Sequence, residues 1–150
     1  MRYVIDTNVL VHIVRNSKTW QWIALTFSPF SEENQTFVSL VSLAEILAFA
    51  ERNNWGDTKK ETLKVILSKL NVLEINSLLL ESYVNIDLYS QGLHSQHKLP
   101  QGVSARNMGK NDLWIAASTH KAQADLITTD KDFLHLDEVF FKVHFVENQG

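Results

Sequence analysis

The sequence contains no cysteine, and this absence excludes several kinds of chemistry. Disulfide bonds, thiolate metal sites and cysteine nucleophiles cannot occur in the chain. Glycine is also scarce, with five residues in the whole chain and none before Gly56. Because a dinucleotide-binding fold needs a glycine-rich turn after its first strand, that class of cofactor-binding protein is excluded as well.

Long hydrophobic runs are missing too. No window of about 18 apolar residues exists, as a membrane-spanning helix would require. The longest apolar run, Leu40–Ala50, is interrupted by Glu45. At the N-terminus, Asp6 comes too early for the hydrophobic region of a signal peptide to form. We therefore expect a cytoplasmic protein with no membrane segment.

The chain has little excess of charge of either sign. Its formal net charge is −3, whereas many nucleic-acid-binding domains are strongly basic. If four acids were committed to a metal ion, however, the remaining residues would carry a slight positive charge. Net charge therefore does not decide whether the partner is a nucleic acid.

The length of 150 residues suits one domain with a single sizeable core.

Short apolar segments alternate with amphipathic stretches along the chain. The predicted strands are Arg2–Ile5, Thr36–Leu40, Val72–Ile75, Leu126–Thr128 and Val143–Val146. The predicted helices are Val9–Val14, Ser17–Phe27, Ser42–Asn53, Asp57–Leu70, Ser77–Ser90 and Asn111–Gln123. This alternation predicts an α/β fold with a central, mostly parallel β-sheet flanked by helices.

Four carboxylates occur where the chain passes from a strand or loop into a helix: Asp6, Glu45, Asp112 and Asp130. Ligands bind such sheets at the carboxyl ends of the strands, where these acids can converge. Two like charges about 4 Å apart repel by roughly 4 kcal/mol at an effective dielectric constant near 20, so a cation or a proton must relieve them. Oxygen ligands favour Mg²⁺ or Mn²⁺ over zinc, and such a site suits phosphodiester hydrolysis.

Each of these acids also has a purely structural explanation. Asp6 and Asp130 are suitable N-cap residues, whose oxygens accept hydrogen bonds from free helix N–H groups. Glu45 follows Ser42 by three residues, the spacing of a capping box in the first helical turn. Asp112 could be an acid favoured by the helix dipole. The metal-site hypothesis therefore depends on the four acids together.

Three segments of the chain resemble the signature segments of the PIN-domain family. They are Tyr3–Asn8 (YVIDTN), Gly109–Ala117 (GKNDLWIAA) and Thr128–Phe133 (TTDKDF), and Ser42–Glu45 (SLAE) resembles the remaining acidic position. The order and spacing of these segments match over essentially the whole chain. The resemblance implies a single PIN domain over residues 1–150, with a three-layer α/β fold.

The same resemblance implies an activity and a site. Asp6, Glu45, Asp112 and Asp130 would form the acidic quartet that binds Mg²⁺ or Mn²⁺, in an endoribonuclease similar to the VapC toxins. Thr7 and Asn8 would brace the first aspartate, and Asp132 would be an outer-shell or surface acid. RNA would be the substrate, an antitoxin protein a partner, and homodimers are common in the family. The alternative is a catalytically silent PIN-like scaffold that binds RNA or protein.

The polar stretch before Asp112 is rich in basic residues. No acid occurs between Leu88 and Asn111, whereas Lys98, Arg106 and Lys110 do. We hypothesise that these three side chains contact RNA phosphates beside the metal site. A merely solvated loop is the alternative.

Two further features suggest surface roles. His94 and His97 stand three residues apart, but without a third ligand they are predicted to be exposed loop histidines. Trp20, Ile23 and Phe27 share one face of a predicted helix. By resemblance to the family, that face could form part of a groove for a partner helix.

Overall fold

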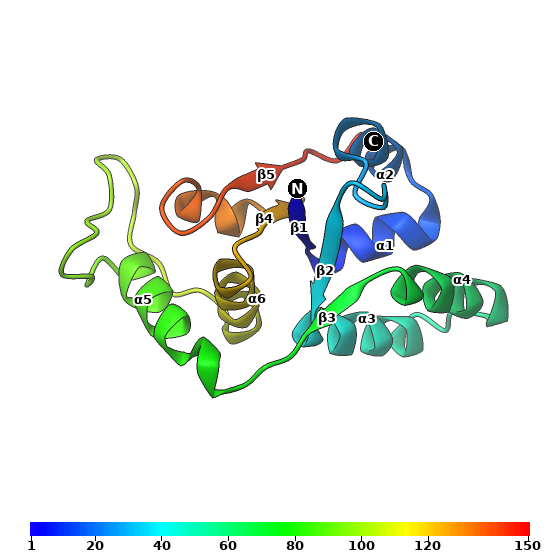
Figure 1. Cartoon of the computed structure of the whole chain (residues 1–150), viewed down its shortest axis with the longest axis horizontal. Coiled ribbons are helices and arrows are strands. Elements are labelled where there is room, and N and C mark those ends of the chain that lie inside the picture. The colour runs from blue at the N-terminus through cyan, green and yellow to red at the C-terminus, as the bar shows by residue number, and fades with distance from the viewer.

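A computed structural model describes the whole chain, residues 1–150 (Figure 1). Its strands are β1 (Arg2–Ile5), β2 (Gln35–Ser39), β3 (Asn71–Leu73), β4 (Asp125–Thr128) and β5 (Val143–Phe145). They form one sheet in the order β3-β2-β1-β4-β5, and every pairing is parallel. The predicted sheet is confirmed and is parallel throughout.

The helices cover both faces of this sheet, as predicted. They are α1 (Thr7–Arg15), α2 (Lys18–Phe27), α3 (Leu40–Arg52), α4 (Asp57–Ser68), α5 (Leu80–Ser90) and α6 (Lys110–Lys121), with short 3₁₀ helices η1 (Ser77–Leu79) and η2 (Lys131–Leu136). Figure 1 shows α1 to α4 on one side of the sheet and the α5–α6 pair on the other. None of the helices combines the length and the apolar character needed to cross a bilayer.

The central strand β1 contributes to two hydrophobic cores. Tyr3 and Ile5 pack into the core shared with α1 to α4, whereas Val4 packs into the core shared with α5 and α6. Successive side chains of a strand point to opposite faces, so a continuous apolar strand fits a sheet that is covered on both sides. This burial fixes the position at which β1 ends and Asp6 begins.

The boundary between β2 and α3 differs from the prediction. The helix begins at Leu40, directly after the strand, and its N-cap is Ser39, whose Oγ accepts a hydrogen bond from the Val41 N–H at 3.2 Å. Glu45 therefore lies in the second turn, and the predicted capping box with Ser42 is wrong. The Ser42 hydroxyl is buried and makes no hydrogen bond within the protein.

The short helix η2 was not predicted from the sequence. Asp130 caps it, because its Oδ1 accepts a hydrogen bond from the Asp132 N–H at 2.9 Å. Phe133 and Leu136 of the same helix are fully buried. This tight turn directs Asp130 and Asp132 to the edge of the sheet while anchoring the segment in the core.

The expectation of exposed loop histidines is confirmed for His97 and wrong for His94. His94 is buried, and its Nδ1 accepts hydrogen bonds from the Gln96 and His97 N–H groups at 3.1 and 3.0 Å. The His94 ring therefore stabilises the conformation of its own loop instead of facing solvent. On α2, Ile23 is fully buried, whereas Trp20 and Phe27 are partly buried against the same core, so the partner groove proposed for this face stays a prediction.

Candidate metal centre

Asp6 occupies the carboxyl end of the central strand and is only 4% exposed. Its Oδ1 accepts a hydrogen bond from the Thr7 N–H at 2.7 Å, which is the capping role expected for it. Its Oδ2 accepts a second bond from the Thr128 hydroxyl at 2.7 Å. Because Thr128 ends the neighbouring strand β4, two adjacent strands fix the orientation of this carboxylate.

Glu45 reaches the same edge from α3. The Thr7 hydroxyl donates to Glu45 Oε1 at 2.7 Å, and Asn111 Nδ2 donates to Glu45 Oε2 at 3.4 Å. Thr7 thus contacts both Asp6 and Glu45. Thr7 was predicted to brace the first aspartate; its backbone N–H bonds to Asp6, and its hydroxyl orients Glu45.

The remaining acids come from the other half of the chain. Asp112 lies in the first turn of α6, and Asp130 and Asp132 lie at the start of η2. One carboxylate oxygen from each of these three residues lies within 4.8 Å of the others. Asp132, expected farther out, therefore approaches two of the quartet closely.

One cavity of about 250 Å³ collects the quartet. Its acidic lining residues are Asp6, Glu45, Asp112 and Asp130. Thr7, Asn8 and Arg52 line it as well. Residues separated by more than 100 positions thus meet in one place, as the strand-end argument predicts.

Negative charge in this cavity is poorly compensated. Burial, opposed by hydrogen bonds from Thr128 and Thr7 and reinforced by nearby acids, raises the pKa of Asp6 to about 6. Burial, followed by the charges of Asp6 and the other acids, raises the pKa of Asp112 to about 7. The protein's ion pairs are Lys60–Glu51 and His144–Asp125, so no basic side chain pairs with these acids. A set of oxygen donors with excess negative charge fits a hard divalent cation.

We expect ionisation of Asp6 and Asp112 to lower the stability of the metal-free protein as pH rises from about 4 to about 7. Both folded-state pKa values, about 6 for Asp6 and about 7 for Asp112, lie above the ordinary value of 3.8. In that window the folded state keeps protons that the unfolded chain has released, so the free energy of unfolding falls with rising pH. Thermal melts in EDTA across this range measure the effect, and added Mg²⁺ should remove most of it. Burial lowers the pKa of His135 to about 4, and this group makes stability rise with pH over part of the same range. The deciding quantity is therefore the difference between melts with Mg²⁺ and melts in EDTA, and a difference that does not grow with pH would contradict the account.

Three lining or bracing residues escaped the sequence analysis: Thr128, Asn111 and Arg52. Asn111 directly precedes Asp112, and Thr128 lies two residues before Asp130, but the sequence alone does not indicate which hydroxyl or amide contacts a carboxylate. Arg52 closes α3, where a basic residue is explained equally well by the helix dipole.

The Thr128→Val substitution is expected to weaken Mn²⁺ binding about tenfold. The Thr128 hydroxyl donates to the Asp6 carboxylate and accepts from the Asp130 backbone N–H at 3.0 Å, so valine removes a bond that orients Asp6 and a bond that positions the backbone of Asp130. Losing a buried hydrogen bond costs about 1–3 kcal/mol. Calorimetric titration measures the affinity. Thr119→Val is the matched control, because its buried hydroxyl bonds only to the Ile115 carbonyl at 2.8 Å. Equal affinities in the two variants would exclude the bracing role of Thr128.

One of the three basic residues hypothesised to contact RNA lines a cavity together with acids of the site. Arg106 lines a cavity of about 260 Å³ that also contains Asp112 and Asp132. Lys98 and Lys110 are exposed and do not line that cavity. Of the three residues hypothesised to contact RNA, the structure therefore puts Arg106 beside the acidic site.

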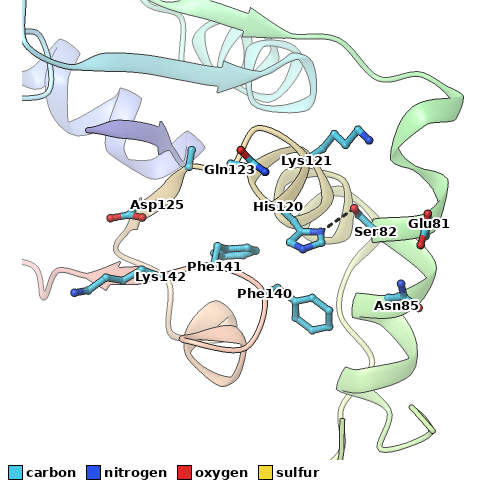
Figure 2. Close-up of a pocket in the computed structure, with 11 residues that line it drawn as sticks. Glu81, Ser82, Asn85, His120, Lys121, Gln123, Asp125, Phe140, Phe141 and Lys142 are labelled. Atoms are coloured by element: carbon cyan, nitrogen blue, oxygen red, sulfur yellow. Dashed lines mark hydrogen bonds between the residues drawn. The ribbon is translucent and has the colours of Figure 1, made fainter. Parts of the chain in front are cut away.

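A larger cavity, of about 620 Å³, lies elsewhere, at the opposite edge of the sheet near the start of β4 (Figure 2). Its charges are balanced, with Lys121 and Lys142 against Glu81 and Asp125. Its histidine, His120, is hydrogen-bonded to the Ser82 hydroxyl at 2.9 Å, drawn as a dashed line in Figure 2. Size alone therefore does not mark the functional site of this protein.

Comparison with known proteins agrees with this geometry. The family model described as "PIN domain" matches residues 3–139. The chain belongs to the PIN-domain family. PIN-domain nucleases generally depend on a divalent cation, and the acidic cluster of this PIN domain is of the kind that binds one.

Individual relatives are similar over nearly their whole length. A protein named Ribonuclease VapC1 from Haemophilus influenzae is 26% identical over 140 residues, which cover 93% of this chain and 95% of that protein. Among solved structures, VapBC2 from Rickettsia felis bound to a promoter DNA fragment has a TM-score of 0.74 at 18% identity, covering 98% of this chain and 100% of the other. VapBC-1 from nontypeable Haemophilus influenzae has a TM-score of 0.66 at 22% identity, with 97% and 98% coverage. These structures share the PIN fold with this chain.

Proposed function

We propose that this chain is a Mg²⁺- or Mn²⁺-dependent endoribonuclease and the toxin of a toxin–antitoxin pair, with residues 1–150 acting as one PIN domain. The observation that carries the proposal is the convergence of Asp6, Glu45, Asp112 and Asp130 on one cavity without a basic partner. Relatives named as ribonucleases support the choice of RNA as the substrate. The completeness of the quartet favours an enzyme over a silent scaffold.

The residues of the site have different roles in this proposal. When bound, a divalent cation lowers the pKa of water and neutralises charge that develops on a phosphate. Asp6, Asp112 and Asp130 would hold it, with Glu45 beside them and Asp132 at the margin. Thr7 and Thr128 keep Asp6 in one orientation through bonds of 2.7 Å each. Asn8, which lines the same cavity, follows Thr7 and lies two residues after Asp6 in the chain.

Partners of this protein are also inferred from its relatives. Similar proteins are found in VapBC complexes, and we propose that an antitoxin protein binds this chain and inhibits it. On α2, Trp22 and Leu25 are 43% and 85% exposed and offer apolar contact to such a partner. We also propose a homodimer, supported by the apolar stripe Leu80, Val84 and Leu88 exposed along α5. Sedimentation velocity of the isolated protein measures that assembly.

Cleavage of a mixed single-stranded RNA pool tests the proposed activity. Fragments should appear with Mg²⁺ or Mn²⁺, disappear in EDTA, and return when the metal ion is restored. Binding of Mn²⁺ is measured on the same preparation by calorimetry. A folded protein that neither cleaves the pool nor binds Mn²⁺ would favour the silent PIN-like scaffold.

A further inference from the structure

A second cavity, of about 500 Å³, adjoins the acidic one. The two cavities share Asn8 and Val11 of α1 and Phe49 of α3 as lining residues. From there the second cavity runs along α1 past His12 and Arg15 to Lys18 in the first turn of α2. Asn8 and Arg15 are seven residues apart, or about 10 Å along a helix, so the cavity continues the acidic site sideways.

The charged side chains of this second cavity have the opposite sign to the acids of the first. Arg15 and Lys18 line it, none of its lining side chains is acidic, and neither cation forms an ion pair. The guanidinium of Arg15 lies over the Phe49 ring, 5.8 Å from its centroid. Because Phe49 lines both cavities, this contact holds the charge of Arg15 beside the acidic site.

The first turn of α2 adds donors to the same cavity. Ser17 caps this helix by accepting a hydrogen bond from the Trp20 N–H at 3.1 Å, which leaves the Lys18 and Thr19 N–H groups without partners in the protein. Free N–H groups at a helix N-terminus attract anions. Here they occur together with two unpaired cations, Arg15 and Lys18, and that combination suits phosphate.

We propose that this cleft, lined by Arg15, Lys18 and the first turn of α2, binds the backbone of the RNA strand next to the phosphate that is cut. The inference rests on the proposed ribonuclease function and adds a binding site for the adjoining nucleotides. Arg15 and Lys18 contact phosphate oxygens, whereas Phe49 is a positioning residue for Arg15. The other end of the acidic cavity adjoins Arg106, so basic groups flank the acids on both sides. This arrangement lets a strand cross a site that is itself negatively charged.

The test measures binding of a short fluorescent single-stranded RNA at several salt concentrations. The protein is the full-length Asp112→Asn variant, which leaves the RNA intact. Adding Arg15→Gln and Lys18→Gln should make the slope of log affinity against log salt shallower by about 1.4, because each phosphate contact contributes about 0.7 on a single strand. The matched control is Lys121→Gln with Lys142→Gln, which removes two cations from the opposite edge (Figure 2).

The outcomes separate this inference from the proposed function. A slope change confined to the Arg15 and Lys18 variant supports the cleft, and equal changes in both double variants would overturn it. Displacement of the RNA by polyglutamate as readily as by unlabelled RNA would assign the cleft to an acidic protein segment instead. If the double variant melts early, the exposed Lys18→Gln change alone should still shift the slope by about 0.7. Failure of the wild-type protein to cleave RNA would refute the enzyme without changing this binding result.

Discussion

Replacing Asp112 with asparagine is expected to slow RNA cleavage about a thousandfold, which corresponds to about 4 kcal/mol of lost transition-state stabilisation. Asp112 lies within 4.8 Å of two other carboxylates and lines the cavity shared by the quartet. Asparagine keeps its size but removes the negative charge that would attract the cation. Initial rates on single-stranded RNA with Mn²⁺ measure the loss.

Stability of the same variant provides a second readout. Because Asp112 is held at a raised pKa of about 7, its ionisation costs the metal-free protein stability at pH 8. The Asp112→Asn protein should therefore melt about 3 °C higher than wild type in EDTA at that pH, for an effect near 1 kcal/mol. Asp57→Asn, at the exposed start of α4, is the matched control and should change neither rate nor melting temperature appreciably. An Asp112→Asn protein that cleaves RNA at the wild-type rate would remove Asp112 from the site.

Replacing Phe133 with alanine is expected to lower the free energy of unfolding by about 3–5 kcal/mol. Phe133 is fully buried in the core beneath α5 and α6, and it anchors the 3₁₀ helix that begins beside Asp130 and Asp132. The cavity left by the ring would lower the melting temperature by roughly 10 °C for a chain of this size. It would also loosen two acids of the site, so Mn²⁺ affinity should fall with stability.

Leu134→Ala is the neighbouring control for this change. Leu134 is 42% exposed, so its truncation should cost less than about 1 kcal/mol. The Phe133→Leu variant fills most of the volume and should retain metal binding. If Phe133→Ala unfolds at the same denaturant concentration as Leu134→Ala, the anchoring role of the ring is wrong.

The sequence predicts the fold and the meeting of the acids because both depend on burial. Val4, buried on one face of β1, and Ile5, buried on the other, are the last apolar residues before Asp6, and so they mark the end of the strand in the sequence. The same rule brings Asp130 to the edge after β4. Strand ends can be recognised in a sequence because the run of apolar side chains stops there. Parallel pairing then places the carboxyl ends of the strands, and the acids that follow them, at one edge of the sheet.

The features of the site that the sequence does not predict depend on tertiary contacts. Thr128 orients Asp6 across 122 positions, and no pattern within either segment reveals a hydroxyl pointing at a carboxylate. Asp132 approaches Asp112 because a tight 3₁₀ turn follows Asp130, whereas a regular helix or a loop would direct it elsewhere. His94 is buried because its ring accepts backbone hydrogen bonds, which polar composition alone does not indicate.

Glu45 shows how a local motif can mislead. Ser42 and Glu45 have the spacing of a capping box, but Ser39 caps the helix and moves Glu45 into the second turn. There its oxygens accept hydrogen bonds from Thr7 and Asn111, across 38 and 66 positions of the chain. The position of Glu45 in the site is therefore set by tertiary contacts and not by its own helix end.

Analysis of the RNA product ends, in water enriched in ¹⁸O, tests the central claim most directly. If the acidic cluster holds a cation for hydrolysis, products formed with Mg²⁺ or Mn²⁺ will carry a 5′-phosphate containing ¹⁸O and a 3′-hydroxyl. EDTA and the Asp112→Asn variant should both abolish these products. Products ending in 2′,3′-cyclic phosphate, or cleavage that persists in EDTA, would contradict the account, because the RNA would then be cut by its own 2′-hydroxyl without the acidic site.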